Sequence, residues 1–171
     1  MSTATTADAE FIHPTTSQLV RAVFLGGLAA AILDSIDAII AYKVAFGFNP
    51  VSIYQFVASG LLGQSAFAGG IPTALLGVLI HLAIAFSAAG VFSVASLKLE
   101  PLRTHFILAG IGFGFLVYAF MSYLVIPLSA IPPSPFSLPL LVNGLAGHAL
   151  FVGLPIAFFA RRATPCRCER P

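Results

Sequence analysis

The sequence predicts an all-α membrane protein whose chain crosses the bilayer four times. Of its 171 residues, 58% are hydrophobic and 8% are charged, whereas roughly 25% of residues are charged in ordinary soluble domains. The mean hydropathy is +1.00. A soluble protein of this length could not bury so much apolar surface, because much of its exterior must face water. We therefore expect a polytopic helical bundle whose main partner is the lipid bilayer.

Four apolar segments are long enough to span a bilayer, which takes about 20 helical residues. They cover about residues 19–42, 72–95, 104–127 and 138–160. We expect the first to be retained as a helix, because no basic segment precedes it and no small-residue cleavage site follows it.

Two polar ends flank the predicted spans. Residues 1–18 are rich in Ser, Thr and Ala, which is typical of a disordered segment, and residues 161–171 form a basic tail. The tail contains Cys166 and Cys168. A structural zinc site normally has four ligands, so these two thiols favour a reduced tail without metal.

A fifth helix is predicted at about residues 50–68, between the first two spans. Asn49 followed by Pro50 is typical of an N-cap and the first helical position. We expect this helix to be interfacial or re-entrant. Its polar residues Tyr54, Gln55 and Gln64 would then lie among the lipid headgroups.

The basic residues predict the orientation of the chain. Seven fall on one side of the four-span arrangement: Arg21, Lys98, Arg103, Arg161, Arg162, Arg167 and Arg170. Only Lys43 falls on the other side. Because basic residues concentrate in cytoplasmic loops, both termini are predicted to be cytoplasmic.

Each span also contributes polar side chains to one layer of the bundle. The residues are Asp34, Asp37, His81, Tyr118, Asn143 and His148. From the helical rise of 1.5 Å per residue, they lie about 7–15 Å from the outer ends of their spans. Inserting a charged residue near the bilayer centre costs about 2.5–3.5 kcal/mol, so the presence of one calls for a functional or structural explanation. This layer is the candidate site.

Three hypotheses explain the layer. In the first, the two carboxylates and two histidines pass protons, as Asp/His chains do in pumps and transporters. In the second, Asp34, Asp37, His81 and His148 bind a divalent metal, or the two histidines clamp a haem. In the third, the polar contacts only hold the helices together in a structural or accessory subunit.

Two further patterns bear on packing and on the class of protein. Gly110 and Gly114, four residues apart in the third span, predict a close helix contact. We find no nucleotide-binding or catalytic motif and no basic-aromatic surface. These absences argue against a nucleic-acid partner and disfavour an enzyme.

The C-terminal third resembles the YagU family of small bacterial inner-membrane proteins. The similar residues are Ile131-Pro132-Pro133, Phe136, Leu138-Pro139, Asn143, Gly147-His148 and Arg161-Arg162. The resemblance implies a bacterial inner membrane and, through the family's link to acid resistance, a role in proton or pH stress. Asp34 and Asp37 are not part of this pattern, so the implication does not extend to them.

The leading prediction is a small transport or proton-handling protein without a bound cofactor. The alternatives are a metal- or haem-binding module and an accessory subunit of a membrane complex. Four spans make a poor solitary conduit, which favours a homodimer by symmetry.

Overall fold

A computed structural model describes residues 14–133 and 136–163 of the chain. Every regular element in this part of the chain is helical. Four helical stretches are long and apolar enough to cross a membrane: Thr16–Phe46, Gly70–Lys98, Phe106–Leu128 and Leu138–Ala163. The predicted fold class, an all-α polytopic membrane protein, is confirmed.

Helix α1 (Thr16–Phe46) starts earlier and ends later than expected. The side chain of Thr15 accepts the N–H of Gln18, and the Gln18 side chain accepts the N–H of Thr15. This capping box fixes the helix start, so the prediction of disorder is wrong for residues 16–18. The helix ends at Gly47, whose φ of 70° is the left-handed conformation that glycine adopts without strain. Residues 1–13 lie outside the described part of the chain.

Helix α2 (Pro50–Leu62) begins as its sequence suggests, because the side chain of Asn49 accepts the N–H of Ser52 at 2.9 Å. A 3₁₀ segment, η1 (Gly63–Ala68), follows it. Gln55 is buried, and its amide donates to the carbonyl of Gly70 at 3.0 Å. The expectation that Gln55 lies among headgroups is therefore wrong: this side of α2 packs on the protein.

Helix α3 (Gly70–Lys98) packs closely against α2 at a glycine. A Cβ at Gly77 would collide with the backbone of Tyr54. The two helices can approach this closely only because Gly77 has no side chain. Glycine therefore sets the position of α2 and, with it, the position of Tyr54.

The third and fourth spans each consist of several helical pieces. After α4 (Pro101–Thr104), the third contains α5 (Phe106–Phe120), η2 (Met121–Val125) and α6 (Ile126–Leu128). The fourth contains α7 (Leu138–Gly147), η3 (His148–Gly153) and α8 (Leu154–Ala163). It extends three residues into the predicted basic tail. Residues 164–171, including Cys166 and Cys168, lie outside the described residues.

Segments η2 and η3 are π-helical, and a proline follows each within two residues. Pro127 and Pro155 have no N–H to donate to the carbonyl four residues earlier, and their rings crowd that carbonyl. A wider π turn is one way for a membrane helix to absorb this defect. In the fourth span, the wider turn begins at His148, one of the predicted site residues.

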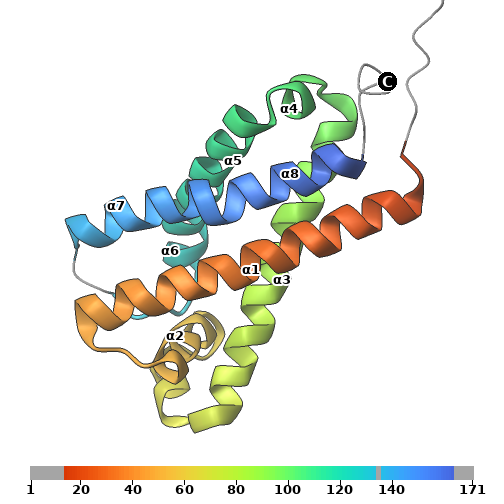
Figure 1. The fold of residues 1–171 in the computed structure, drawn as a ribbon. Coiled ribbons are helices and arrows are strands. Elements are labelled where there is room, and N and C mark those ends of the chain that lie inside the picture. Colours follow the sequence, from red (N-terminus) through yellow and green to blue (C-terminus); the bar gives the residue numbers. More distant parts are fainter. Residues whose placement is uncertain (1–13, 134–135, 164–171) are drawn as a thin grey trace, which may run out of the picture.

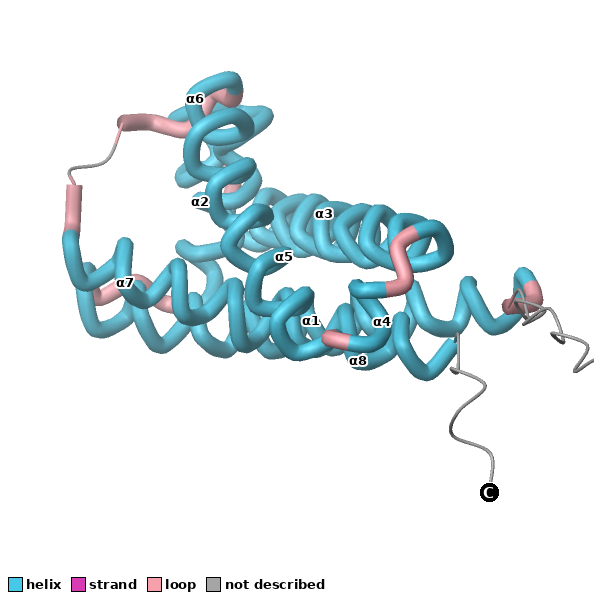
Figure 2. Tube along the Cα trace, turned by 90° about the horizontal axis from the view of Figure 1, so that it is seen from above, coloured by secondary structure: helices cyan, strands magenta, loops and turns pink. Residues whose placement is uncertain are grey.

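The spans alternate in direction, so that the start of α1 and the end of α8 lie at the same end of the bundle (Figure 1). The end of α3 and α4 lie at this end too, and we call it the arginine end because Arg21, Arg103, Arg161 and Arg162 belong to these segments. Helix α1 packs against α3 and α8, and α5 packs against η3 and α8. At the opposite end, a loop connects α6 to α7, as the perpendicular view shows (Figure 2).

Small side chains make these contacts close. A Cβ at Gly153 would collide with the carbonyl of Gly110, and one at Gly114 with the carbonyl of His148. Gly110 and Gly114 thus lie at the contact between the third and fourth spans. The buried core beside them contains Ala30, Ala89, Phe92, Val152, Ile156, Ala157 and Ala160. On α1, on α3 and on the fourth span, these core residues lie nearer to the arginine end than the predicted polar layer does.

Candidate functional site

A cavity of about 550 Å³ lies between the four spans and α2. All six residues of the predicted layer line it: Asp34, Asp37, His81, Tyr118, Asn143 and His148. Each is partly exposed, as expected for side chains that border an open space. The polar groups of four separate helices therefore converge on one chamber.

The carboxylate of Asp34 lies between two imidazoles. Its Oδ2 is 4.0 Å from Nε2 of His81, and its Oδ1 is 3.9 Å from Nδ1 of His148. Both distances exceed the usual upper limit of about 3.2 Å for an N–H···O hydrogen bond. The two histidines are thus close enough to interact electrostatically with Asp34 without donating to it directly.

Both of these ring nitrogens already have another partner. Nε2 of His81 is 3.1 Å from the carbonyl of Ala31, and Nδ1 of His148 is 3.0 Å from the carbonyl of Gly144. A carbonyl oxygen can only accept, so each of these nitrogens must carry the proton and donate it. These two hydrogen bonds identify the tautomer of each neutral imidazole, with the proton on Nε2 in His81 and on Nδ1 in His148. Asp34 is left without a direct donor among the described residues.

Asp37 is in a different environment. The amide of Asn143 donates to its Oδ2 at 2.8 Å, which joins α1 to α7. A Cβ at Gly147 would come within 2.5 Å of the same oxygen, so glycine is needed for this approach. Asp37 therefore has the hydrogen bond that Asp34 lacks.

Tyr118 packs on the histidine of the fourth span. Its ring meets that of His148 edge to face, with the centroids 5.3 Å apart and the planes at 77°. A Cβ at Gly144 would collide with the ring of Tyr118. Tyr118 thus helps to fix the orientation of His148 beside the cavity.

Two residues that the sequence did not single out as site residues also line the cavity. The hydroxyl of Tyr54 on α2 donates to Oγ of Ser35 at 3.0 Å, and its ring lies 6.4 Å from that of His81. Ser35 follows Asp34 directly in the sequence, and this position was the signal that could have identified it as a site residue. No such signal existed for Tyr54, because its position depends on the contact of α2 with Gly77.

The predicted metal set does not form in the described part of the chain, where no group of three or more His, Cys, Asp or Glu residues is placed to hold a metal ion. Asp37 is bonded to Asn143, and the imidazole nitrogens nearest Asp34 donate to carbonyls. A haem clamp would need both imidazoles to face an iron between them. Here they face a carboxylate.

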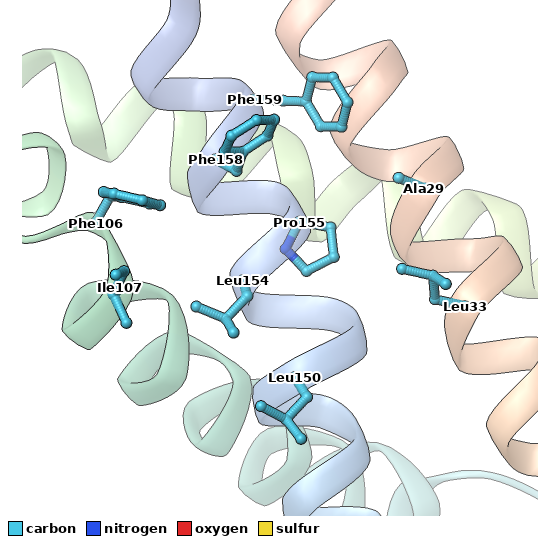
Figure 3. A pocket seen from close by; sticks show the side chains of 9 residues that line it. All are labelled: Ala29, Leu33, Phe106, Ile107, Leu150, Leu154, Pro155, Phe158 and Phe159. Atoms are coloured by element: carbon cyan, nitrogen blue, oxygen red, sulfur yellow. The ribbon is translucent and has the colours of Figure 1, made fainter.

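A second hollow, of about 450 Å³, lies on the outside of α1, α5 and α8 (Figure 3). Its walls are apolar: Ala29, Leu33, Phe106, Ile107, Leu150, Leu154, Pro155, Phe158 and Phe159. None of these side chains can hold or move a proton. Of these two hollows, only the inner cavity is lined by side chains that can do so.

Comparisons with protein families, curated proteins and solved structures give no match. The resemblance to the YagU family stays a prediction.

Proposed function

We propose that the chain is a small transport or proton-handling protein in which Asp34 is the group that takes up and releases the proton. One observation carries the proposal. The Asp34 carboxylate borders a cavity inside the bundle, and the two ring N–H groups at 3.9 and 4.0 Å are bonded to backbone carbonyls.

The physical reason is the cost of an ionised carboxylate inside a membrane. That cost is about 2.5–3.5 kcal/mol near the bilayer centre, and direct hydrogen bonds lower it. Asp34 has no such bond among the described residues, whereas Asn143 donates to Asp37. The imidazoles of His81 and His148, 4.0 and 3.9 Å from its oxygens, are groups of the kind that relay protons in pumps and transporters.

We infer that Asp34 is reached from one end of the bundle. The cavity lining runs from Ala30, Ala88 and Val152 in the middle to Phe136 and Ser137 at the end opposite the arginines. The buried core lies on the other side of it. With the arginine end in the cytoplasm, as the positive-inside rule predicts, the cavity faces away from the cytoplasm. From the resemblance to the YagU family, we propose that this membrane is a bacterial inner membrane.

A structural role is the second candidate, and it fits Asp37 better than Asp34. The bond from Asn143 to Asp37 joins two spans directly, as polar contacts do in many membrane bundles. We therefore assign proton exchange to Asp34 and helix pairing to Asp37.

The experiment is proton uptake into proteoliposomes that contain a trapped pH-sensitive dye, driven by an imposed membrane potential. Asp34→Asn should abolish protein-dependent uptake while the purified protein stays monodisperse. The matched control is Glu100→Gln, which removes an exposed acid outside the cavity and should leave uptake unchanged. Equal uptake by wild type and Asp34→Asn would refute the assignment.

A further inference from the structure

The inner cavity is larger than proton exchange requires. A proton relay needs only a chain of side chains and a few waters, whereas sites for small molecules typically enclose about 300–1,000 Å³. The cavity of about 550 Å³ falls within that range. Its size points to a molecular ligand.

The charge of the lining restricts the class of ligand. Asp34 and Asp37 both border the cavity, and no Lys or Arg is among the described residues that line it. Lys43 on α1 is exposed and outside the lining. The carboxylates are therefore not neutralised by a fixed cation, which favours a cationic ligand over an anionic one.

The aromatic residues of the lining restrict the class of ligand further. Tyr42, Tyr54, Tyr118 and Tyr123 line the cavity together with Phe56 and Phe136. Aromatic faces attract organic cations, and such cages are a common means of recognising substituted ammonium groups. A small, strongly hydrated metal ion gains less from such walls, and no metal-ligand set is present among the described residues.

We propose that the cavity binds a small organic cation, such as an alkylated or aromatic amine. The carboxylates of Asp34 and Asp37 attract its charge, and the tyrosine rings contact its apolar surface. The inference rests on the proposed function in that it names the substrate class of the same cavity. The ligand enters from the end opposite the arginines, where Phe136 and Ser137 border the cavity.

The test is equilibrium binding to detergent-purified protein of three cations of increasing size: tetraethylammonium, ethidium and tetraphenylphosphonium. Isothermal titration gives Kd for each. At least one should bind saturably, and Asp34→Asn should weaken it about tenfold, the effect of roughly 1.4 kcal/mol of lost attraction. Glu100→Gln should bind as the wild type does.

A second variant covers the case in which Asp34→Asn does not fold. Ser122 lines the cavity and is only partly exposed, so Ser122→Lys places a positive charge in the chamber and should also weaken binding. Failure of all three cations to bind the wild type, or undiminished binding by both variants, would overturn the proposal. Proton uptake that depends on Asp34 in a protein that binds no cation would leave the proposed function standing and remove only this inference.

Discussion

The hydrogen bond between Asn143 and Asp37 offers the most quantitative test of the site. Its N–O distance of 2.8 Å is typical of a bond to a carboxylate, and it links residues 106 positions apart in the sequence. Bonds to charged groups contribute about 1.5–3 kcal/mol in soluble proteins. Interhelical polar bonds measured in a membrane bundle average about 0.6 kcal/mol, with a maximum near 1.7.

Both side chains are partly exposed to the cavity, which lowers the value through solvent screening. We therefore expect a coupling energy of about 1 kcal/mol, or a change of roughly fivefold in the ratio of folded to unfolded protein. The measurement is a double-mutant cycle of Asp37→Ala and Asn143→Ala, with the free energy of unfolding taken from denaturant titrations in bicelles.

The losses of the two single variants should sum to about 1 kcal/mol more than the loss of the double variant, because either single change already removes the bond. Asp37→Ala and Tyr118→Phe serve as a control cycle, since no hydrogen bond joins that pair. Strictly additive losses for Asp37 and Asn143 would show that the bond does not hold α1 to α7, and would refute the division of roles between Asp34 and Asp37.

Further predictions concern helix contacts. Gly114→Ala should destabilise the protein by about 1–3 kcal/mol, because its Cβ would collide with the carbonyl of His148. Gly112→Ala should be nearly neutral, because nothing lies within 4 Å of a Cβ at that position. Denaturant titration of both variants tests this difference, and equal losses of stability would contradict it. Tyr54→Phe should cost about 0.5–1.5 kcal/mol through loss of the hydrogen bond to Ser35. Ser35→Ala should cost a similar amount and add nothing in the Tyr54→Phe background, a result that fully additive losses would exclude.

The polar layer could be predicted from the sequence because its members are conspicuous. Asp34 and Asp37 are three residues apart within an apolar span, and the helical rise alone brings His81 and His148 to a similar depth. All of them line the one cavity. Their division into a bonded and an unbonded carboxylate could not be predicted, because it depends on the rotation of α7 that brings Asn143 to Asp37.

Other features were harder to predict for identifiable reasons. The inward face of α2 depends on Gly77, which resembles any other glycine of a membrane helix. The π segments have a local signal in Pro127 and Pro155, but a proline can also kink or end a helix. The capping box of Thr15 and Gln18 was a readable signal for the start of α1.

The central claim is that Asp34 is the carboxyl group that exchanges a proton with the cavity. Infrared difference spectroscopy of the protein in lipid, recorded between acidic and alkaline pH, tests it directly because a protonated carboxyl has its own carbonyl band. We predict that one such band disappears in Asp34→Asn and persists in both Asp37→Asn and Glu100→Gln. A set of carboxyl bands that is the same in the wild type and in Asp34→Asn, or the loss of that one band in Asp37→Asn alone, would contradict the claim.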